Sequence, residues 1–231
     1  MPHIFLGDKL PSTRVDAIKA VFDTRSDIFD TSLDYSTDSV YVKLKNSQTG
    51  FRIQTQQYSE SSDGVKLIVC MYDSTGTMVG NEQSILYLGY NIKQTWFDYL
   101  PTKDGILFGG YQVNQAQSHD TYVVPCYAGT ECIMAINSSS RGFICSKTAT
   151  IMDGAELYLL PVRISQEAIA ISNVYAGDDT FFEELYFTTV RPPSASETVY
   201  TATVEGENYY IPSPYAQSLY YFFAVKAPQE T

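Results

Sequence analysis

The segment Gly64–Tyr90 has the clearest pattern of apolar and polar positions in the chain. Within Val65–Tyr72 the side chains alternate between two unequal faces, which is the period of a β-strand. Asp73-Ser74-Thr75-Gly76 follows, and both Asp and Gly favour a tight reversal of the chain. Thr77-Met78-Val79 then predicts the returning strand, and Ser84–Tyr90 predicts a further apolar strand. We therefore expect a buried β-hairpin inside a larger sheet, around which the rest of the chain is arranged.

Similar short runs recur along the chain, separated by turn residues at intervals of about 8–12 positions, as in all-β proteins. Gly109-Gly110 indicates a bulge or a close backbone contact, and Pro161 indicates a sheet edge. The last run is apolar on both faces, which predicts a strand in the middle of a packed sheet. The expected strands are Val40–Lys45, Phe51–Gln54, Thr95–Leu100, Ile106–Tyr111, Tyr122–Val124, Cys132–Ile136, Phe143–Cys145, Leu157–Ile164, Phe181–Val190, Thr198–Val204, Tyr209–Ile211 and Leu219–Val225.

Before the strands, the apolar residues are spaced as in an α-helix and not as in a β-strand. The segment Thr13–Asp23 places its apolar residues on one helical face and predicts the one helix of the chain, with Thr13 as its cap. A helix this short is unstable alone, so it must dock either on its own sheet or on a neighbouring subunit. Before it, Met1–Leu10 is expected to be an extended arm, and Thr24–Ser39 an irregular connection after it.

These elements predict an all-β protein, an antiparallel β-sandwich of jelly-roll type with an N-terminal arm and one short helix. The expected organisation is an arm, helix and connection over residues 1–39, followed by a β-sandwich domain over residues 40–231. Arg191–Ser196, with two prolines among small polar residues, is the best candidate for an internal linker.

Composition narrows the function classes. A chain of 231 residues with 44% hydrophobic and 14% aromatic residues can form a packed core. The formal net charge of −11 disfavours binding to nucleic acid or to anionic membranes, and no basic run offsets it. The apolar start at Met1–Leu6 is interrupted by Gly7-Asp8-Lys9, so no secretion signal is expected. Synthesis in a cytoplasm and reduced cysteine thiols follow from that expectation.

Residues suited to catalysis are few. His119 lies in a predicted polar loop without a nucleophile motif, and Cys126 and Cys132 lack the spacing of a structural zinc site. Asp178-Asp179 follows a glycine in a predicted turn, which favours a solvated or calcium-binding loop. The adjacent Glu183-Glu184 should point to opposite faces of a strand and so cannot act on one bond together. We therefore expect no enzyme, no cofactor and no metal centre.

Aromatic side chains are the remaining candidates for function. Tyrosine and tryptophan rings can stack on sugars or anchor protein interfaces, although most rings in a β-protein fill its core. A carbohydrate-binding sandwich that recognises a host surface glycan is therefore an alternative hypothesis. The rings assigned to glycan stacking are those of Trp96, Tyr99, Tyr209 and Tyr215.

The opening phrase Ile4-Phe5-Leu6-Gly7-Asp8-Lys9-Leu10 is similar to the openings of tailed-bacteriophage tail and baseplate proteins. The whole chain also resembles virion components, because it combines a tyrosine-rich β-sandwich with little catalytic equipment. The resemblance implies a homo-oligomeric structural or fibre role in the tail or on the capsid surface. It implies location in the virion after synthesis in the host cytoplasm, with copies of itself and other virion proteins as partners.

Under this hypothesis the N-terminal elements make the subunit contacts. The arm Met1–Leu10 and the helix Thr13–Asp23 would reach onto neighbouring subunits and bury their apolar side chains there. Deletion of residues 1–23 would then leave the sandwich folded and abolish assembly. The predicted partner contacts are Ile4, Phe5, Leu6, Val15, Ile18 and Phe22.

Overall fold

The computed structural model consists mainly of antiparallel β-strands, with one short helix in the part of the chain that it describes. The prediction of an all-β protein is therefore confirmed. Within the described ranges no helix has the length and apolar character needed to cross a bilayer. The structure describes residues 3–5, 11–33, 37–56, 64–72, 75, 77–89, 95–114, 119–136, 142–146, 151–153, 171–175, 181–188, 199–212 and 222–229.

The N-terminal sheet is a meander in the order β2-β3-β4-β5-β6, with each strand antiparallel to the next. In β3 and β4 buried residues such as Val42 and Phe51 alternate with half-buried polar residues such as Lys43 and Arg52. In these two strands one face is therefore apolar and the other polar. The strands are β2 (Phe29–Asp30), β3 (Ser39–Leu44), β4 (Thr49–Gln56), β5 (Gly64–Tyr72) and β6 (Met78–Gly89).

The central sheet has the order β1-β7-β8-β9-β10-β11-β12. Strand β8 carries apolar side chains on both faces of this sheet. Ile106 and Phe108 belong to one core cluster, whereas Leu107 between them belongs to another. The sheet is therefore covered on both sides. Its strands are β1 (His3–Phe5), β7 (Thr95–Pro101), β8 (Gly105–Asn114), β9 (His119–Gly129), β10 (Cys132–Ile136), β11 (Gly142–Ser146) and β12 (Ile151–Asp153).

The C-terminal sheet has the order β13-β14-β17-β16-β15, so β17 pairs on both sides and lies in the middle. Phe223, Ala224 and Val225 are all buried, which confirms the central strand predicted from Leu219–Val225 within the described residues. The strands are β13 (Ile171–Tyr175), β14 (Phe181–Thr188), β15 (Val199–Val204), β16 (Glu207–Pro212) and β17 (Phe222–Lys226).

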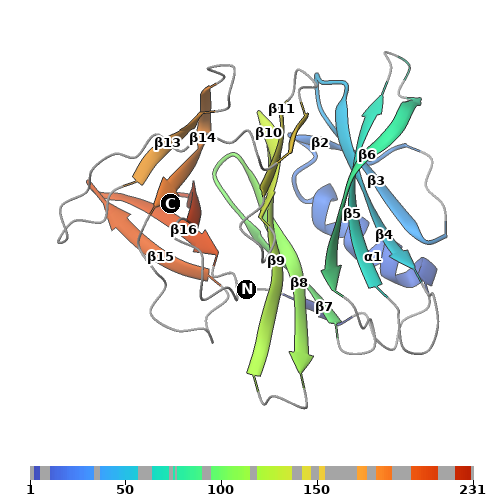
Figure 1. The fold of residues 1–231 in the computed structure, drawn as a ribbon, viewed down its shortest axis with the longest axis horizontal. Coiled ribbons are helices and arrows are strands. Elements are labelled where there is room, and N and C mark those ends of the chain that lie inside the picture. Colours follow the sequence, from blue (N-terminus) through green and yellow to red (C-terminus); the bar gives the residue numbers. More distant parts are fainter. Residues whose placement is uncertain are drawn as a thin grey trace.

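The three sheets stand side by side, with the central sheet between the other two (Figure 1). One core cluster joins the N-terminal sheet, the helix α1 (Pro11–Asp23) and the central sheet. A second cluster joins the opposite face of the central sheet to the C-terminal sheet, through residues such as Tyr127 and Phe223. The strand order within each sheet is mainly that of a meander, and neither the sandwich nor the jelly-roll part of the prediction is confirmed.

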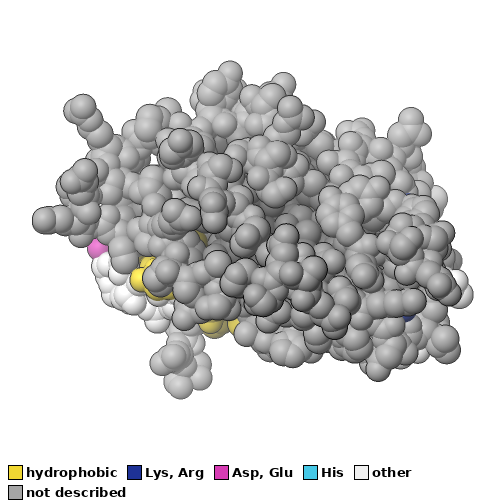
Figure 2. All heavy atoms as spheres, turned by 60° about the horizontal axis from the view of Figure 1, so that its bottom comes forward, with side chains coloured by type: hydrophobic (Ala, Val, Ile, Leu, Met, Phe, Trp, Pro, Cys, Tyr) yellow, Lys and Arg dark blue, Asp and Glu magenta, His cyan; other side chains and the backbone are white. Residues whose placement is uncertain are grey.

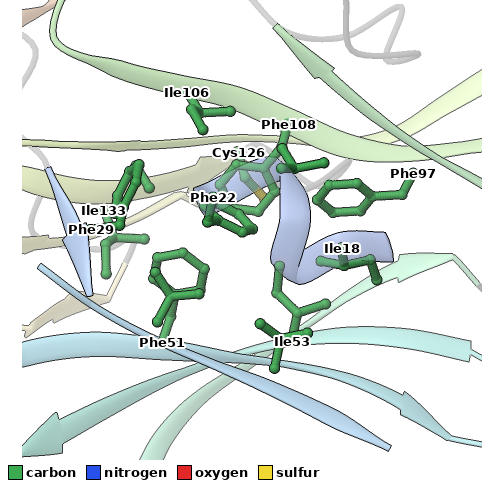
Figure 3. Packing of buried hydrophobic residues seen from close by; sticks show 14 of the residues in the cluster. Ile18, Phe22, Phe29, Phe51, Ile53, Phe97, Ile106, Phe108, Cys126 and Ile133 are labelled. Carbon is green, nitrogen blue, oxygen red and sulfur yellow. The ribbon is translucent and has the colours of Figure 1, made fainter. Parts of the chain in front are cut away.

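Helix α1 supplies the centre of the first core cluster, between the two sheets (Figure 3). The side chains of Val15, Ile18 and Phe22 are each 0% exposed, as expected for a helix that buries one apolar face. The Phe22 ring meets the rings of Phe51 and Phe108 edge-on, at centroid distances of 5.2 and 5.4 Å. The helix therefore docks within its own chain.

The helix begins earlier than predicted. It starts at Pro11, so the assignment of Thr13 as its cap is wrong. Proline suits the first helical position because its fixed φ matches the helix and its missing N–H is not needed there. The predicted irregular connection Thr24–Ser39 also contains a short strand, β2, which pairs with the end of β3.

Two strand predictions were too short. The hairpin of β5 and β6 is confirmed, but residues 77–79 and 84–90 do not form separate strands, because β6 runs continuously from Met78 to Gly89. A register shift opposite β5 lets the long strand continue across the polar residues between these runs. Likewise β9 begins at His119, where a loop was expected, and β8 has a register shift at Gly110, as predicted.

Candidate functional site

An open, polar pocket of about 480 Å³ lies where the central and C-terminal sheets meet. Its lining comes from the turns that join β7 to β8 and β9 to β10, together with strands β14 and β17. It combines carboxylates, ammonium groups, a hydroxyl and a phenol. The lining residues are Lys103, Asp104, Thr130, Glu131, Glu183, Glu184, Tyr186 and Lys226.

Glu184 is the buried member of this pocket, and the residue is 4% exposed. Its Oε2 accepts hydrogen bonds from the Tyr127 hydroxyl at 2.9 Å and from the N–H and hydroxyl of Thr130 at 3.2 and 3.0 Å. Its Oε1 accepts the backbone N–H of Glu131. A carboxylate of the C-terminal sheet thus accepts hydrogen bonds from two backbone N–H groups in a turn of the central sheet. The N–H of Thr130 is shared with the carbonyl oxygen of Asp104 at 3.1 Å.

The carboxylate of Glu131 makes a hydrogen bond in the opposite direction, from the central sheet to the C-terminal sheet. Glu131 Oε2 accepts the backbone N–H of Glu183 at 2.8 Å, so the turn after β9 also binds strand β14. Each of the two sheets therefore provides a glutamate that caps a backbone N–H of the other. We call this arrangement of Glu131, Glu184, Tyr127 and Thr130 the glutamate clasp. Charge-assisted hydrogen bonds of this kind are shorter and stronger than bonds between neutral groups.

Gly129 makes room for the clasp. A Cβ atom at this position would lie 2.1 Å from the Tyr127 hydroxyl and 2.8 Å from Glu184 Oε2. Its partner across the ladder, Gly105, is similarly constrained, because a Cβ there would lie 2.1 Å from the Ala128 carbonyl oxygen. Two glycines opposite each other thus let the backbones of β8 and β9 approach closely beneath the pocket.

Arg25, just after α1, binds the turn that joins β7 to β8 and lines the pocket. Its Nη1 donates to the carbonyl oxygens of Thr102 and Gly105 at 2.8 and 3.0 Å. Its Nη2 donates to the carbonyl oxygen of Lys103 at 3.3 Å and to Asp27, which pairs with the same guanidinium. The planar fork of arginine suits such multiple contacts. The N-terminal helix region therefore positions a turn that lines a pocket on the far side of the central sheet.

Burial governs the electrostatics of the clasp. It raises the pKa of Glu184 from 4.5 to about 7, because the hydrogen bonds from Glu131, Tyr127 and Thr130 offset only part of the cost of burying a charge. The negative charge of Glu131 raises the pKa of Glu184 further. Burial, followed by the charge of Glu184, also raises the pKa of Tyr127. The clasp therefore changes its charge near neutral pH.

This shift predicts a stability that falls as the pH rises. The folded chain holds the Glu184 proton up to a pH of about 7, whereas the unfolded chain releases it near 4.5. The contribution of this proton is thus fully present below pH 4.5 and is lost as the pH rises through 7. The shift corresponds to about 3 kcal/mol. Urea unfolding at a series of pH values should show this decline, and Glu184→Gln should flatten it.

The matched control is Glu183→Gln, one residue earlier on the same strand, where the side chain is exposed. This variant removes the same charge from the same pocket and should leave the pH profile unchanged. If the stability of Glu184→Gln declines with pH as steeply as that of the wild type and of Glu183→Gln, Glu184 does not cause the decline.

The two adjacent glutamates differ as expected in burial, since Glu184 is buried and Glu183 exposed. Both residues belong to the lining of the same pocket. The oxygens of Glu184 are occupied by hydrogen bonds from the chain itself. The chemistry visible at this site is therefore the joining of two sheets by a titratable group.

A second feature stands apart from the pocket. Among the described strands, β13 and β15 are the two edges of the C-terminal sheet. The ladder of β13 has a register shift, whereas β15 pairs residue by residue with β16 from Val199 to Val204. The two strands are joined through Glu205 and Gly206, whose φ angles of 52° and 83° fit a type I′ turn. Thr201 and Thr203 are exposed. Figure 2 shows described hydrophobic side chains at the left of one face, the end of the molecule at which Figure 1 places β15.

The assignment of Val15, Ile18 and Phe22 as partner contacts is wrong. These side chains lie in the core between the N-terminal and central sheets, where no partner can reach them without unfolding the domain. The backbone of Ile4 and Phe5 pairs with β7 of the same chain, so this part of the arm extends the chain's own sheet. Leu6 lies outside the described residues.

The rings assigned to glycan stacking do not converge. Tyr209 is 8% exposed and its ring packs edge-on against Tyr186 at 5.2 Å, so it cannot stack on a sugar. Tyr99 is half-buried against the first core cluster, in another sheet. The backbone of Trp96 belongs to β7, but its side chain is outside the described part, as is all of Tyr215.

The other candidate residues are also separated. Cys126 and Cys132 belong to different core clusters on opposite faces of the central sheet, so they cannot bind one metal ion together. No group of His, Cys, Asp and Glu side chains suited to a metal ion is found among the described residues. The backbone of His119 lies in β9. Asp178-Asp179, Leu157–Ile164 and the linker Arg191–Ser196 fall outside the described ranges.

From the sequence, Glu184 was identified only as one member of the adjacent pair Glu183-Glu184. The roles of Tyr127, Thr130 and Arg25 were not predicted, because they depend on residues more than fifty positions away. One signal was present: a glutamate inside a strongly β-prone apolar run is costly unless it has partners. That signal indicates a buried acid, but it does not name the turn that binds it.

The fold and the site define an all-β protein in which hydrogen-bonded carboxylates join the central and C-terminal sheets. Comparisons with protein-family models, with curated proteins and with solved structures found no match to this chain.

Proposed function

We propose that this chain is a structural subunit of a virion, of the kind found in bacteriophage tails or on capsid surfaces. It acts by packing against copies of itself and other virion proteins. In this proposal the three sheets form a layered sandwich that serves as a rigid body, and contacts between subunits carry the function. The observation that supports it best is the outer strand β15 of the C-terminal sheet.

An outer strand exposes backbone N–H and C=O groups that can pair with another chain. Soluble proteins usually block such strands with charges, prolines, bulges or very short length. The strand β15 reads VYTATV, without charge or proline, and its pairing with β16 is regular throughout. By contrast β2 spans only two residues and carries Asp30. A strand left in this form is suited to pairing with a partner strand.

The proposed class of protein is the one expected from the sequence, but the elements proposed to make the contacts between subunits are different. The helix cannot be the adhesive element, since its apolar face lies in the chain's own core. Deletion of residues 1–23 is therefore expected to unfold the N-terminal and central sheets, and not only to abolish assembly. The contacts between subunits are assigned instead to sheet edges.

Sedimentation velocity of the wild-type chain at increasing protein concentration tests this function. We expect larger species of defined stoichiometry to appear as the concentration rises, with ordered assemblies visible by electron microscopy. A chain that remains monomeric at the highest attainable concentration contradicts the proposal. So does growth into particles without defined size, because that is aggregation and not assembly.

A further inference from the structure

We propose that two copies of this chain pair through β15, antiparallel and related by a two-fold axis through Ala202. This inference rests on the proposed function and names the partner of the edge strand as a second copy. The pairing would join the two C-terminal sheets into one continuous sheet. Three features support it: the direction of the free backbone groups, the order of the side chains and the distribution of charge.

The backbone direction follows from the hairpin. The pair Val204 and Glu207 closes a two-residue turn, so the two residues face each other across the ladder. Because the directions alternate along an antiparallel strand, Val204, Ala202 and Tyr200 face β16. The N–H and C=O of Thr201 and Thr203 therefore point away from the sheet. Both are exposed, so a partner strand can reach them.

The order of side chains suits a two-fold axis. Read from Ala202 in both directions, the strand places Thr201 and Thr203 one step away, and Tyr200 and Val204 two steps away. In the symmetric pair Thr201 then lies opposite Thr203 of the second copy, and both outward pairs exchange hydrogen bonds. On the other face Tyr200 meets Val204 of the second copy. Thr–Thr and aromatic–β-branched pairs are both favourable across strands.

The charge distribution favours a second copy at this strand over other parts of the surface. The chain carries a net charge of −11, so two copies repel each other in general. The strand β15 has no charged residue, and Thr201 and Thr203 bring no like charges together across the axis. The pairing stops at the turn, where Glu205 is exposed and its backbone leaves the strand conformation.

The expected dimer is weak. A pair of short strands buries much less than the roughly 1,600 Å² of a standard interface, so it should form only at high protein concentration. Such a contact suits a subunit that is concentrated by an assembly, where several weak contacts act together.

Thr201→Pro tests the contact by sedimentation velocity. Proline removes the outward N–H of Thr201 and leaves the bonds between β15 and β16 intact, since edge strands tolerate proline on their free side. We expect Thr201→Pro to fold as the wild type does and to lose self-association. The matched control Thr201→Val keeps the N–H and should still associate. Ala202→Pro, which removes an N–H facing β16, should instead lower the unfolding midpoint.

A disulfide experiment tests the register. A mixture of Thr201→Cys and Thr203→Cys chains should form a covalent dimer under mild oxidation, because these positions face each other at about 5.5 Å between Cα atoms. Either variant alone should give no more dimer than the wild type with its 4 native cysteines, because residues 201 of the two copies are offset along the strands.

The outcomes separate this inference from the proposed function. A wild type that associates while Thr201→Pro associates equally well overturns pairing through β15 and leaves the structural role standing. A dimer formed equally by Thr201→Cys alone overturns the register centred on Ala202. A wild type that is monomeric at every concentration and a mixture that forms no covalent dimer overturn both.

Discussion

Phe22→Ala is expected to lower the free energy of unfolding by about 3–5 kcal/mol. The ring lies at the junction of three elements, with Phe29 beside it and the rings of Phe51 and Phe108 from the two flanking sheets. Alanine would leave a cavity that these rigid backbones cannot close. A loss of this size is a large fraction of the roughly 5–15 kcal/mol that holds a typical domain together. Urea unfolding followed by tryptophan fluorescence and far-UV circular dichroism measures it.

The control is Phe22→Leu, which keeps most of the volume and should cost less than about 1.5 kcal/mol. The result also decides between the two docking modes open at the level of sequence. A helix docked on a neighbouring subunit would lose association on Phe22→Ala and keep its stability. If Phe22→Ala unfolds at the wild-type urea concentration, the packing of α1 between the two sheets is refuted.

Gly105→Ala is expected to cost at least about 3 kcal/mol, which is the upper part of the range for overpacking. The new Cβ would lie 2.1 Å from the Ala128 carbonyl oxygen and 2.6 Å from the Gly129 Cα atom. Both neighbours are backbone, so no change of rotamer can relieve the overlap. The ladder between β8 and β9 must open locally, and this movement would also disturb the turn held by Arg25. Thermal and urea unfolding measure the loss.

Gly206→Ala is the matched control, because it places the same methyl group where nothing lies within 4 Å. Its only cost is the positive φ of 83°, which should amount to about 1 kcal/mol. Equal losses for the two variants would mean that the backbones of β8 and β9 do not approach each other closely at Gly105.

The strands were predictable because each needs only local information. The alternation of β3 and β4 and the apolar run of β17 appear directly in the sequence, and the structure confirms them within the described residues. The boundaries were less predictable. The strand β6 continues across polar residues that interrupt its pattern, since pairing with β5 supplies hydrogen bonds whatever the side chains are.

The candidate site was much less predictable. The apolar face of α1 was visible, but the same face could cover its own sheet or a neighbour, and only the packing around Phe22 distinguishes these. The clasp joins Tyr127 and Thr130 to Glu184 across two sheets. Its donors are backbone and hydroxyl groups that no sequence pattern marks.

The sequence by itself determined that this chain forms antiparallel sheets and an amphipathic helix near its start, because backbone geometry and the spacing of apolar side chains act over a few residues. Only the tertiary structure decided that α1 packs inside, that the central sheet is covered on both faces and that Glu184 is buried among donors. Those features depend on which segments meet after long loops close. That choice is made by the packing of the whole chain and not by any one segment.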